Sequence, residues 1–158
     1  MPPSLLFDIE SLDLDHVLMA REQIYECLPH GHEFMLLDGL LYMDEQSNTA
    51  IAYHDAREDG FWVRGHLPGR PLFPGILMIE AAAHLASLMA SRFPKFSGKF
   101  LGLAGVGNAK FRETVLPGTR MYFLVSPIEI KARRIIWATQ GVVEGRLVFE
   151  AEIRGMPV

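Results

Sequence analysis

The longest apolar pattern in the chain runs from Ile76 to Ser91 and predicts a helix. This segment contains neither proline nor glycine and is rich in alanine, leucine and methionine, which favour helices. Apolar residues fall on nearly every side of it, which is typical of a helix enclosed by the rest of a fold. Pro74 stands just before it, where the missing N–H of proline costs nothing. We therefore expect a buried central helix.

One narrow polar stripe interrupts this helix. Its members, at spacings of four, three and four residues, are Glu80, His84, Ser87 and Ser91. Such spacings place side chains on one face of a helix. A buried carboxylate is costly unless it is paired or protonated. Glu80 is therefore the first candidate for a functional residue.

The rest of the chain predicts a small helical region followed mainly by strands. The segment 65–75 holds three prolines and three glycines and is expected to be a stiff loop. The other expected elements are short helices within 15–28 and strands at 34–42, 48–54, 100–106 with a continuation at 111–116, 120–130, 134–143 and 146–153. This order indicates an α+β fold in which a curved antiparallel sheet wraps around one long buried helix.

Composition narrows the class of protein further. A length of 158 residues fits a single domain, with residues 1–20 as an N-terminal arm and 21–158 as the core. The net charge of -4 without a long basic run argues against nucleic acid as a partner. The only cysteine, Cys27, favours a reducing compartment, and the N-terminus does not resemble a secretory signal. The apolar helix is too short and too polar at Glu80 to span a membrane, so we expect a soluble, cytoplasmic protein.

The loop and the helix together supply three chemical parts. His66 offers an imidazole that titrates near neutral pH. Gly75 opens the helix, where N–H groups lack internal partners and a glycine permits close approach of an oxygen. Glu80, kept neutral by apolar surroundings, can act as an acid. These parts suit the loss of water from a 3-hydroxyacyl thioester, with the carbonyl on Gly75, His66 as base and Glu80 as acid.

Residues 65–81 resemble the signature of the 3-hydroxyacyl-acyl-carrier-protein dehydratases of bacterial fatty-acid synthesis, which have the hotdog fold. The family pattern is Gly-His-Phe-Pro-Gly-x-Pro-x-x-Pro-Gly-Val-Leu-x-x-Glu-Ala, and this chain departs from it only at Leu67 and Ile76. Weaker similarities occur at Leu-Pro-His (28–30), at 34–38 and at 110–118. The resembling region extends from about residue 24 to residue 153.

This resemblance implies roles for particular residues. His66 and Glu80 would correspond to the catalytic histidine and glutamate, which meet across a dimer interface in the family, and Gly75 to the carbonyl-binding amide. The acyl chain would lie in an apolar tunnel along the helix. The residues expected to contact the substrate are Phe73, Gly75, Ile76 and His84. No metal and no organic cofactor is implied, and the expected partners are an acyl-carrier-protein thioester and further copies of the chain, as a homodimer or a larger assembly of dimers.

Details of the motif favour the branch of the family that dehydrates without isomerising. The branch that also isomerises usually has aspartate at the position of Glu80 and cysteine at the position of Ile76. The chain also departs from the family, which usually has glutamine at the position of His84 and an Arg-aromatic-Pro sequence in place of residues 31–33. His84 lies one helical turn after Glu80 and can hydrogen-bond it; a charged His84 would favour ionised Glu80.

Other functions stay open at this point. A thioesterase would use ionised Glu80 to activate water or attack the thioester, and a non-catalytic acyl-binding subunit would use neither His66 nor Glu80 in chemistry. Glu80 and His66 can also be structural residues, and His84 can serve only to support Glu80.

Two further patterns have both a functional and a plain structural interpretation. His30 and His32, with Glu33 and Asp38 nearby, form at most a weak metal site. A basic cluster can be either a docking patch for an acidic carrier protein or a solvated hairpin, and its members are Lys131, Arg133 and Arg134.

Overall fold

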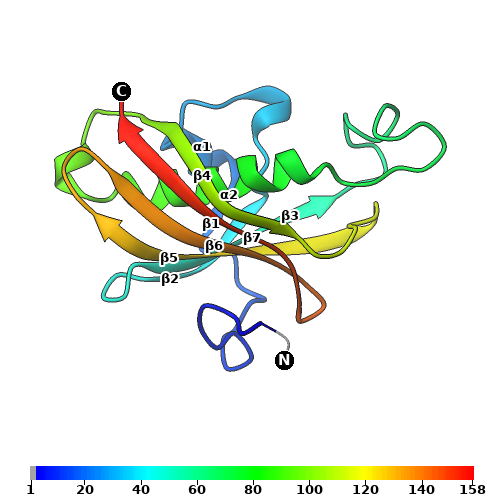
Figure 1. Cartoon of the computed structure of the whole chain (residues 1–158), viewed down its shortest axis with the longest axis horizontal. Coiled ribbons are helices and arrows are strands. Elements are labelled where there is room, and N and C mark those ends of the chain that lie inside the picture. The colour runs from blue at the N-terminus through cyan, green and yellow to red at the C-terminus, as the bar shows by residue number, and fades with distance from the viewer. Residues whose placement is uncertain (1–2) are drawn as a thin grey trace.

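The computed structural model describes residues 3–158 and consists of one curved antiparallel sheet around one long helix (Figure 1). The seven strands have the order β1-β2-β3-β5-β6-β7-β4, and every neighbouring pair is antiparallel. In chain order the elements are β1 (Met19–Ala20), α1 (Arg21–Glu26), η1 (His32–Phe34), β2 (Gly39–Asp44), β3 (Thr49–Ala56), α2 (Gly75–Ala90), η2 (Pro94–Phe96), β4 (Leu101–Phe111), β5 (Thr119–Ile130), β6 (Ile135–Val143) and β7 (Arg146–Pro157).

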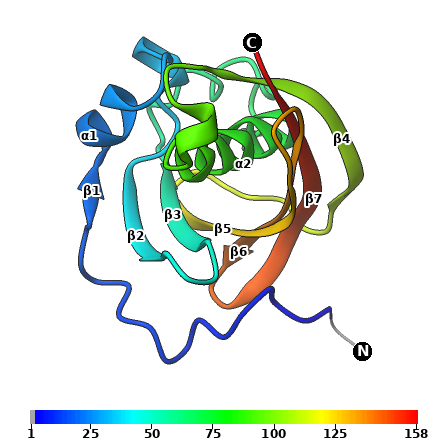
Figure 2. The ribbon, with the colours of Figure 1, turned by 90° about the vertical axis from the view of Figure 1, so that its left-hand side faces the viewer.

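Helix α2 lies inside the curve of the sheet, as the apolar pattern predicted (Figure 2). Ten of its sixteen residues are buried, so the sheet encloses it on most sides. Large side chains from the strands fill the space around it, among them Phe123, Trp137 and Phe149. This arrangement confirms the predicted α+β fold with a curved sheet around a central helix.

Two predicted strand segments lie mostly or partly outside the strands of the structure. The predicted strand at 34–42 begins only at Gly39, because Leu36 and Leu37 enter the core without pairing in the sheet. The carbonyl of Leu36 instead accepts a hydrogen bond from the His54 ring, and the N–H of Leu37 donates to the hydroxyl of Tyr25. Likewise β4 continues to Phe111 and then ends, so the predicted strand at 111–116 is wrong.

The N-terminal arm is tied to the outer face of the sheet (Figure 2). Its apolar side chains cover Ile51, Leu124 and Val142, and they come from Leu5, Leu6, Phe7, Ile9, Leu12 and Leu14. The side-chain amide of Gln140 holds the arm through both its oxygen and its nitrogen. It accepts the N–H of Leu6 at 2.8 Å and donates to the carbonyl of Ser4 at 3.0 Å. Residues 1–2 of the predicted arm lie outside the described residues.

None of the helices in residues 3–158 has both the length and the apolar character that a membrane crossing requires.

Shortening a central side chain of α2 should destabilise the whole fold. Leu85 is 0% exposed, so Leu85→Ala leaves a cavity and should lower the free energy of unfolding by about 2–5 kcal/mol. Val17→Ala is the control, because Val17 is 51% exposed and its truncation should change stability by less than about 0.5 kcal/mol. Urea denaturation followed by circular dichroism measures both. Equal stability of the two variants would contradict the enclosed position of α2.

Candidate functional site

The polar stripe of α2 faces a cavity of about 250 Å³ between the helix and one end of the sheet. From the helix, Glu80, His84 and Ser87 contribute to its wall, and His30 joins them from the loop after α1. Most of the remaining wall is apolar and includes Leu101, Leu103, Ile135, Trp137 and Ile153. The cavity therefore combines a carboxylate and two imidazoles with a surface suited to a hydrocarbon chain.

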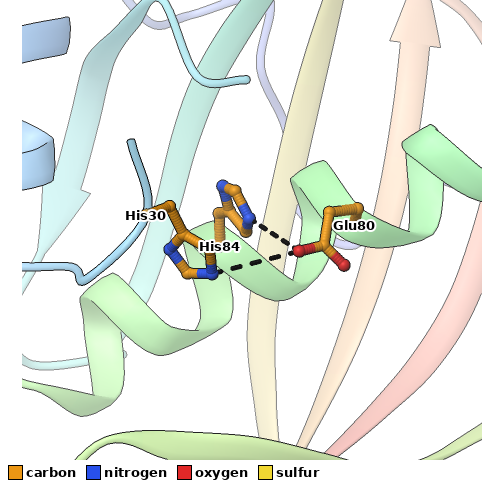
Figure 3. Close-up of side chains that lie close together, drawn as sticks. All are labelled: His30, Glu80 and His84. Carbon is orange, nitrogen blue, oxygen red and sulfur yellow. Dashed lines mark hydrogen bonds and ion pairs between the residues drawn. The ribbon is translucent and has the colours of Figure 1, made fainter. Parts of the chain in front are cut away.

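One carboxylate oxygen of Glu80 faces both imidazoles (Figure 3). Its Oε1 lies 3.0 Å from Nε2 of His84 and 3.9 Å from Nε2 of His30. The two rings stack on each other with their centroids 3.8 Å apart. The other oxygen of Glu80 points away from both rings (Figure 3). Glu80 thus has one oxygen held by the protein and one directed elsewhere.

Tyr25 from α1 completes this cluster behind His84. Its hydroxyl lies 2.8 Å from Nδ1 of His84 and accepts the N–H of Leu37 at 2.9 Å. Burial raises the pKa of Tyr25 far above its ordinary value, so the hydroxyl keeps its proton. No sequence pattern indicates this role, because a tyrosine among the apolar residues of an amphipathic segment is usually a packing residue.

The ionisation of Glu80 differs from the one expected from sequence. The hydrogen bond from His84 lowers the pKa of Glu80 below its usual 4.5; burial opposes this shift, while Coulomb attraction to His84 and His30 adds to it whenever these rings are protonated. Burial is weaker than expected because 30% of the Glu80 side chain is exposed. The prediction that apolar surroundings keep Glu80 neutral is therefore wrong for the free chain, in which Glu80 is ionised at neutral pH.

His66 lies in the stiff loop and has one free ring nitrogen. Its Nδ1 donates to the carbonyl of Leu72 at 2.8 Å, which leaves Nε2 as an acceptor. The backbone of His66 is held as well, because its N–H donates to Trp62 and its carbonyl accepts from Leu72, both at 2.8 Å. His66 does not line the cavity that contains Glu80. Within one chain the structure therefore does not bring these two residues into the same cavity.

The start of α2 offers free backbone donors. The first helical hydrogen bonds run from Leu77 and Met78 to the carbonyl of Pro74, so the N–H groups of Gly75 and Ile76 have no partner within the helix. Ile76 is 71% exposed, although it is apolar. Neither Gly75 nor Ile76 lines the cavity at Glu80 in one chain, so their expected contact with substrate stays a prediction.

Phe73 occupies a different place from the one its predicted role requires. Its side chain is buried, stacks on His54 with centroids 4.8 Å apart and meets Trp62 edge-on at 5.3 Å. It does not line the cavity at Glu80. Phe73 is a core residue that fixes the loop before α2, and its expected contact with substrate finds no support in one chain.

The structure separates the two histidines that suggested a metal site. His32 lines another cavity together with Asp38 and His54, whereas His30 joins Glu80 and His84. The ligand-type atoms of His30, Glu80 and His84 all lie within 4.8 Å of one another, a spacing that can hold a cation. The two atoms of Glu80 and His84 that face each other are already joined by a hydrogen bond. We therefore describe the cluster as a hydrogen-bonded network.

The basic cluster at residues 131–134 forms a solvated hairpin. Lys131 and Arg134 both pair with Glu129, at 2.9 Å and 2.8 Å, and Arg133 is exposed. The backbone groups of Lys131 and Arg134 also bond each other across the turn. These contacts favour the structural interpretation of this cluster over a docking patch.

Comparison with known proteins gives the family. A family model described as a FabA-like domain matches residues 28–152. The chain is 35% identical over 140 residues to the 3-hydroxyacyl-[acyl-carrier-protein] dehydratase FabZ of Clostridium acetobutylicum, covering 89% of this chain and 99% of that protein. It is 30% identical over 131 residues to the FabZ of Clostridium botulinum strain Loch Maree, covering 83% and 90%.

Solved structures with low sequence identity share the fold. The dehydratase heterocomplex ApeI:P from Xenorhabdus doucetiae has a TM-score of 0.72 at 14% identity, covering 85% of this chain and 90% of that chain. A mutant thioesterase from Pseudomonas aeruginosa has a TM-score of 0.67 at 16% identity, covering 92% and 100%. With the match of the family model and the similarity to the FabZ dehydratases, these likenesses show that the chain has the hotdog fold and belongs to the FabA-like domain family.

Proposed function

We propose that this chain dehydrates 3-hydroxyacyl thioesters of acyl carrier protein to trans-2-enoyl thioesters, in fatty-acid or related acyl-chain synthesis. The observation that carries the proposal is the carboxylate of Glu80 at the wall of a mostly apolar cavity. Similarity to FabZ dehydratases over 89% of the chain supports the choice of substrate class. The single cysteine and the role in acyl-chain synthesis favour a cytoplasmic location.

The reaction requires a second copy of the chain, because His66 and Glu80 do not share a cavity in one copy. The edge strand β4 is the natural contact surface. It pairs only with β7, on one side. Large apolar side chains in and beside it are exposed, and they are Phe100, Leu103, Val106 and Phe111.

A long apolar edge strand is a liability unless something covers it. Two copies related by a twofold axis can pair their β4 strands, which extends the sheet and buries these side chains. In the resembling dehydratases the histidine and glutamate meet across such an interface, so we expect each site to combine His66 of one copy with Glu80 of the other.

The elimination can then be described atom by atom. The thioester carbonyl accepts a hydrogen bond at the start of α2, where Gly75 has a free N–H. Nε2 of His66 takes the proton from the carbon next to the carbonyl, while Leu72 holds the opposite nitrogen of the ring. The bond between the next carbon and its hydroxyl oxygen breaks, and this oxygen takes a proton from Glu80 and leaves as water.

Substrate binding supplies the protonated Glu80 that this step needs. In the free chain Glu80 is ionised, since its pKa is lowered by the hydrogen bond from His84. An acyl chain that fills the cavity removes water from around the carboxyl group, and desolvation favours the neutral form. These steps use side chains and backbone amides and need neither a metal nor an organic cofactor.

A thioesterase is the second candidate, and one observation favours it. Hydrolysis would use an ionised carboxylate to activate water, and Glu80 has a lowered pKa in the free chain. Dehydration fits better with the free imidazole nitrogen of His66, which can take a proton from carbon.

Substrate assays distinguish the two reactions. With a 3-hydroxyacyl carrier we expect an enoyl thioester, detected by its ultraviolet absorbance, and with a saturated acyl carrier no release of free thiol. His66→Ala and Glu80→Gln should each lower kcat/KM by about 100-fold or more, because each removes a proton-transfer group. Their circular dichroism should match that of the unmodified chain. Thiol release from the saturated carrier would overturn the proposal, as would a lack of turnover at every chain length.

A mixed dimer tests whether the site is shared between copies. We expect His66→Ala and Glu80→Gln chains, inactive alone, to regain about a quarter of the normal activity when coexpressed in equal amounts. About half of the dimers are then mixed, and each mixed dimer has one site with both residues intact. Isolation of the mixed dimer with two different affinity tags allows its activity to be measured directly. An inactive mixed dimer would show that His66 and Glu80 act within one chain.

A methyl group at the start of α2 tests the carbonyl site. Cβ of an alanine at position 75 would lie 2.8 Å from Cε1 of Phe111, so Gly75→Ala must displace this ring. We expect kcat/KM to fall by about 10-fold or more, because the approach to the backbone donors is obstructed. Gly31→Ala is the matched control, since nothing lies within 4 Å of its added Cβ and its φ of -146° suits alanine. Equal losses in the two variants would argue against a carbonyl site at Gly75.

A further inference from the structure

We propose that Tyr25 and His84 form a positioning relay that fixes one oxygen of Glu80 and directs its acidic proton to the other. The consequence for turnover rests on the proposed role of Glu80 in dehydration, whereas the relay itself can be tested without any activity. Neither Tyr25 nor its contact with His84 is part of the motif by which the chain resembles its family.

The relay begins at a hydroxyl with a fixed direction. The oxygen of Tyr25 accepts the N–H of Leu37 at 2.9 Å, in a segment that enters the core without joining the sheet. This leaves the hydroxyl hydrogen free to donate, and Nδ1 of His84 lies 2.8 Å away. The hydroxyl is therefore anchored from one side and donates on the other.

His84 has little freedom to turn. Its side chain is 1% exposed, both of its ring nitrogens have partners, and the ring of His30 stacks against one face. Because Tyr25 donates to Nδ1, the proton of neutral His84 is on Nε2, which donates to Oε1 of Glu80 at 3.0 Å. The opposite tautomer would leave the Tyr25 hydrogen without this acceptor and would set an unprotonated Nε2 against the carboxylate oxygen.

This arrangement determines where Glu80 carries a proton. Oε1 already accepts the Nε2–H of His84, so a proton on Oε1 would break that hydrogen bond. A proton on Oε2 leaves the whole relay intact, and Oε2 points away from both imidazoles (Figure 3). The acidic proton is thus presented on the oxygen that the protein does not occupy, which is the one available to a leaving hydroxyl group.

Other ionisable groups near Glu80 do not replace this donor. His30 faces it from the loop after α1, with Nε2 at 3.9 Å, beyond hydrogen-bond distance. Arg154 from β7 lines the same cavity but pairs with Glu152 at 3.5 Å. His84 is the direct donor to Glu80 among these groups, and Tyr25 is a positioning residue that acts through His84.

The test is a titration of the Glu80 carboxyl group by NMR with 13C-labelled glutamate, in which Glu80→Gln assigns the signal. His84→Leu removes the donor and should raise the pKa of Glu80. His84→Gln keeps an N–H donor and should raise it less. Tyr25→Phe removes the anchor of the His84 ring and should raise the pKa of Glu80, but by less than His84→Leu does.

Tyr42→Phe is the matched control, because Tyr42 packs on the outer face of the sheet and should leave the titration unchanged.

Kinetics provide a second measurement that a purely structural role would not change. In Tyr25→Phe we expect kcat to fall, because a less firmly held His84 ring no longer fixes Oε1 of Glu80 and the acidic proton is less well directed to the leaving hydroxyl. KM should stay nearly constant, because Tyr25 does not line the cavity. The limb of the pH–rate profile that belongs to Glu80 should move to higher pH by the shift that NMR measures. A Tyr25→Phe chain with an unchanged titration and an unchanged profile would overturn the relay. A shifted titration in a chain without dehydratase activity would overturn the proposed function and leave the relay standing.

Discussion

The enclosure of an almost wholly apolar helix by a single sheet is the constraint on which this structure depends. Because α2 has apolar residues on most sides, the strands must curve around it, and few positions remain for polar groups. The stripe that contains Glu80 and His84 therefore opens into a cavity beside the helix. Fold and site thus depend on the same feature. The burial of α2 shapes the sheet, and it also confines the polar groups of the helix to the stripe that lines the cavity.

Competition between desolvation and hydrogen bonding decides the state of Glu80. Removal of water favours the neutral acid, and a short contact with the Nε2–H of His84 favours the carboxylate. In the free chain the hydrogen bond dominates because the side chain is still partly exposed. A ligand that closes the cavity changes this balance without moving His84, so the same network can hold a carboxylate at rest and a carboxylic acid when occupied.

Much of the fold could be predicted from sequence, because its strongest patterns are local. The bounds of α2 agree to within one residue. The predicted strands at 134–143 and 146–153 are also found, joined by a hairpin whose residues 144 and 145 have the positive φ angles 50° and 77°. Where prediction failed, partners distant in sequence decided the outcome. Leu37 bonds a tyrosine instead of a strand, and Tyr25 and His84 are 59 residues apart. His66 and Glu80 do not share a cavity within one chain, so their predicted meeting is part of the proposed dimer.

The strap formed by the N-terminal arm has a consequence for how the protein is made. Ser4 and Leu6 are held by Gln140, a contact across about 135 residues. During translation these residues are made well before β6, yet their binding surface on β3, β5 and β6 is complete only after β6 has emerged. The apolar arm must therefore wait, exposed, until β6 has been synthesised, and it docks late in folding.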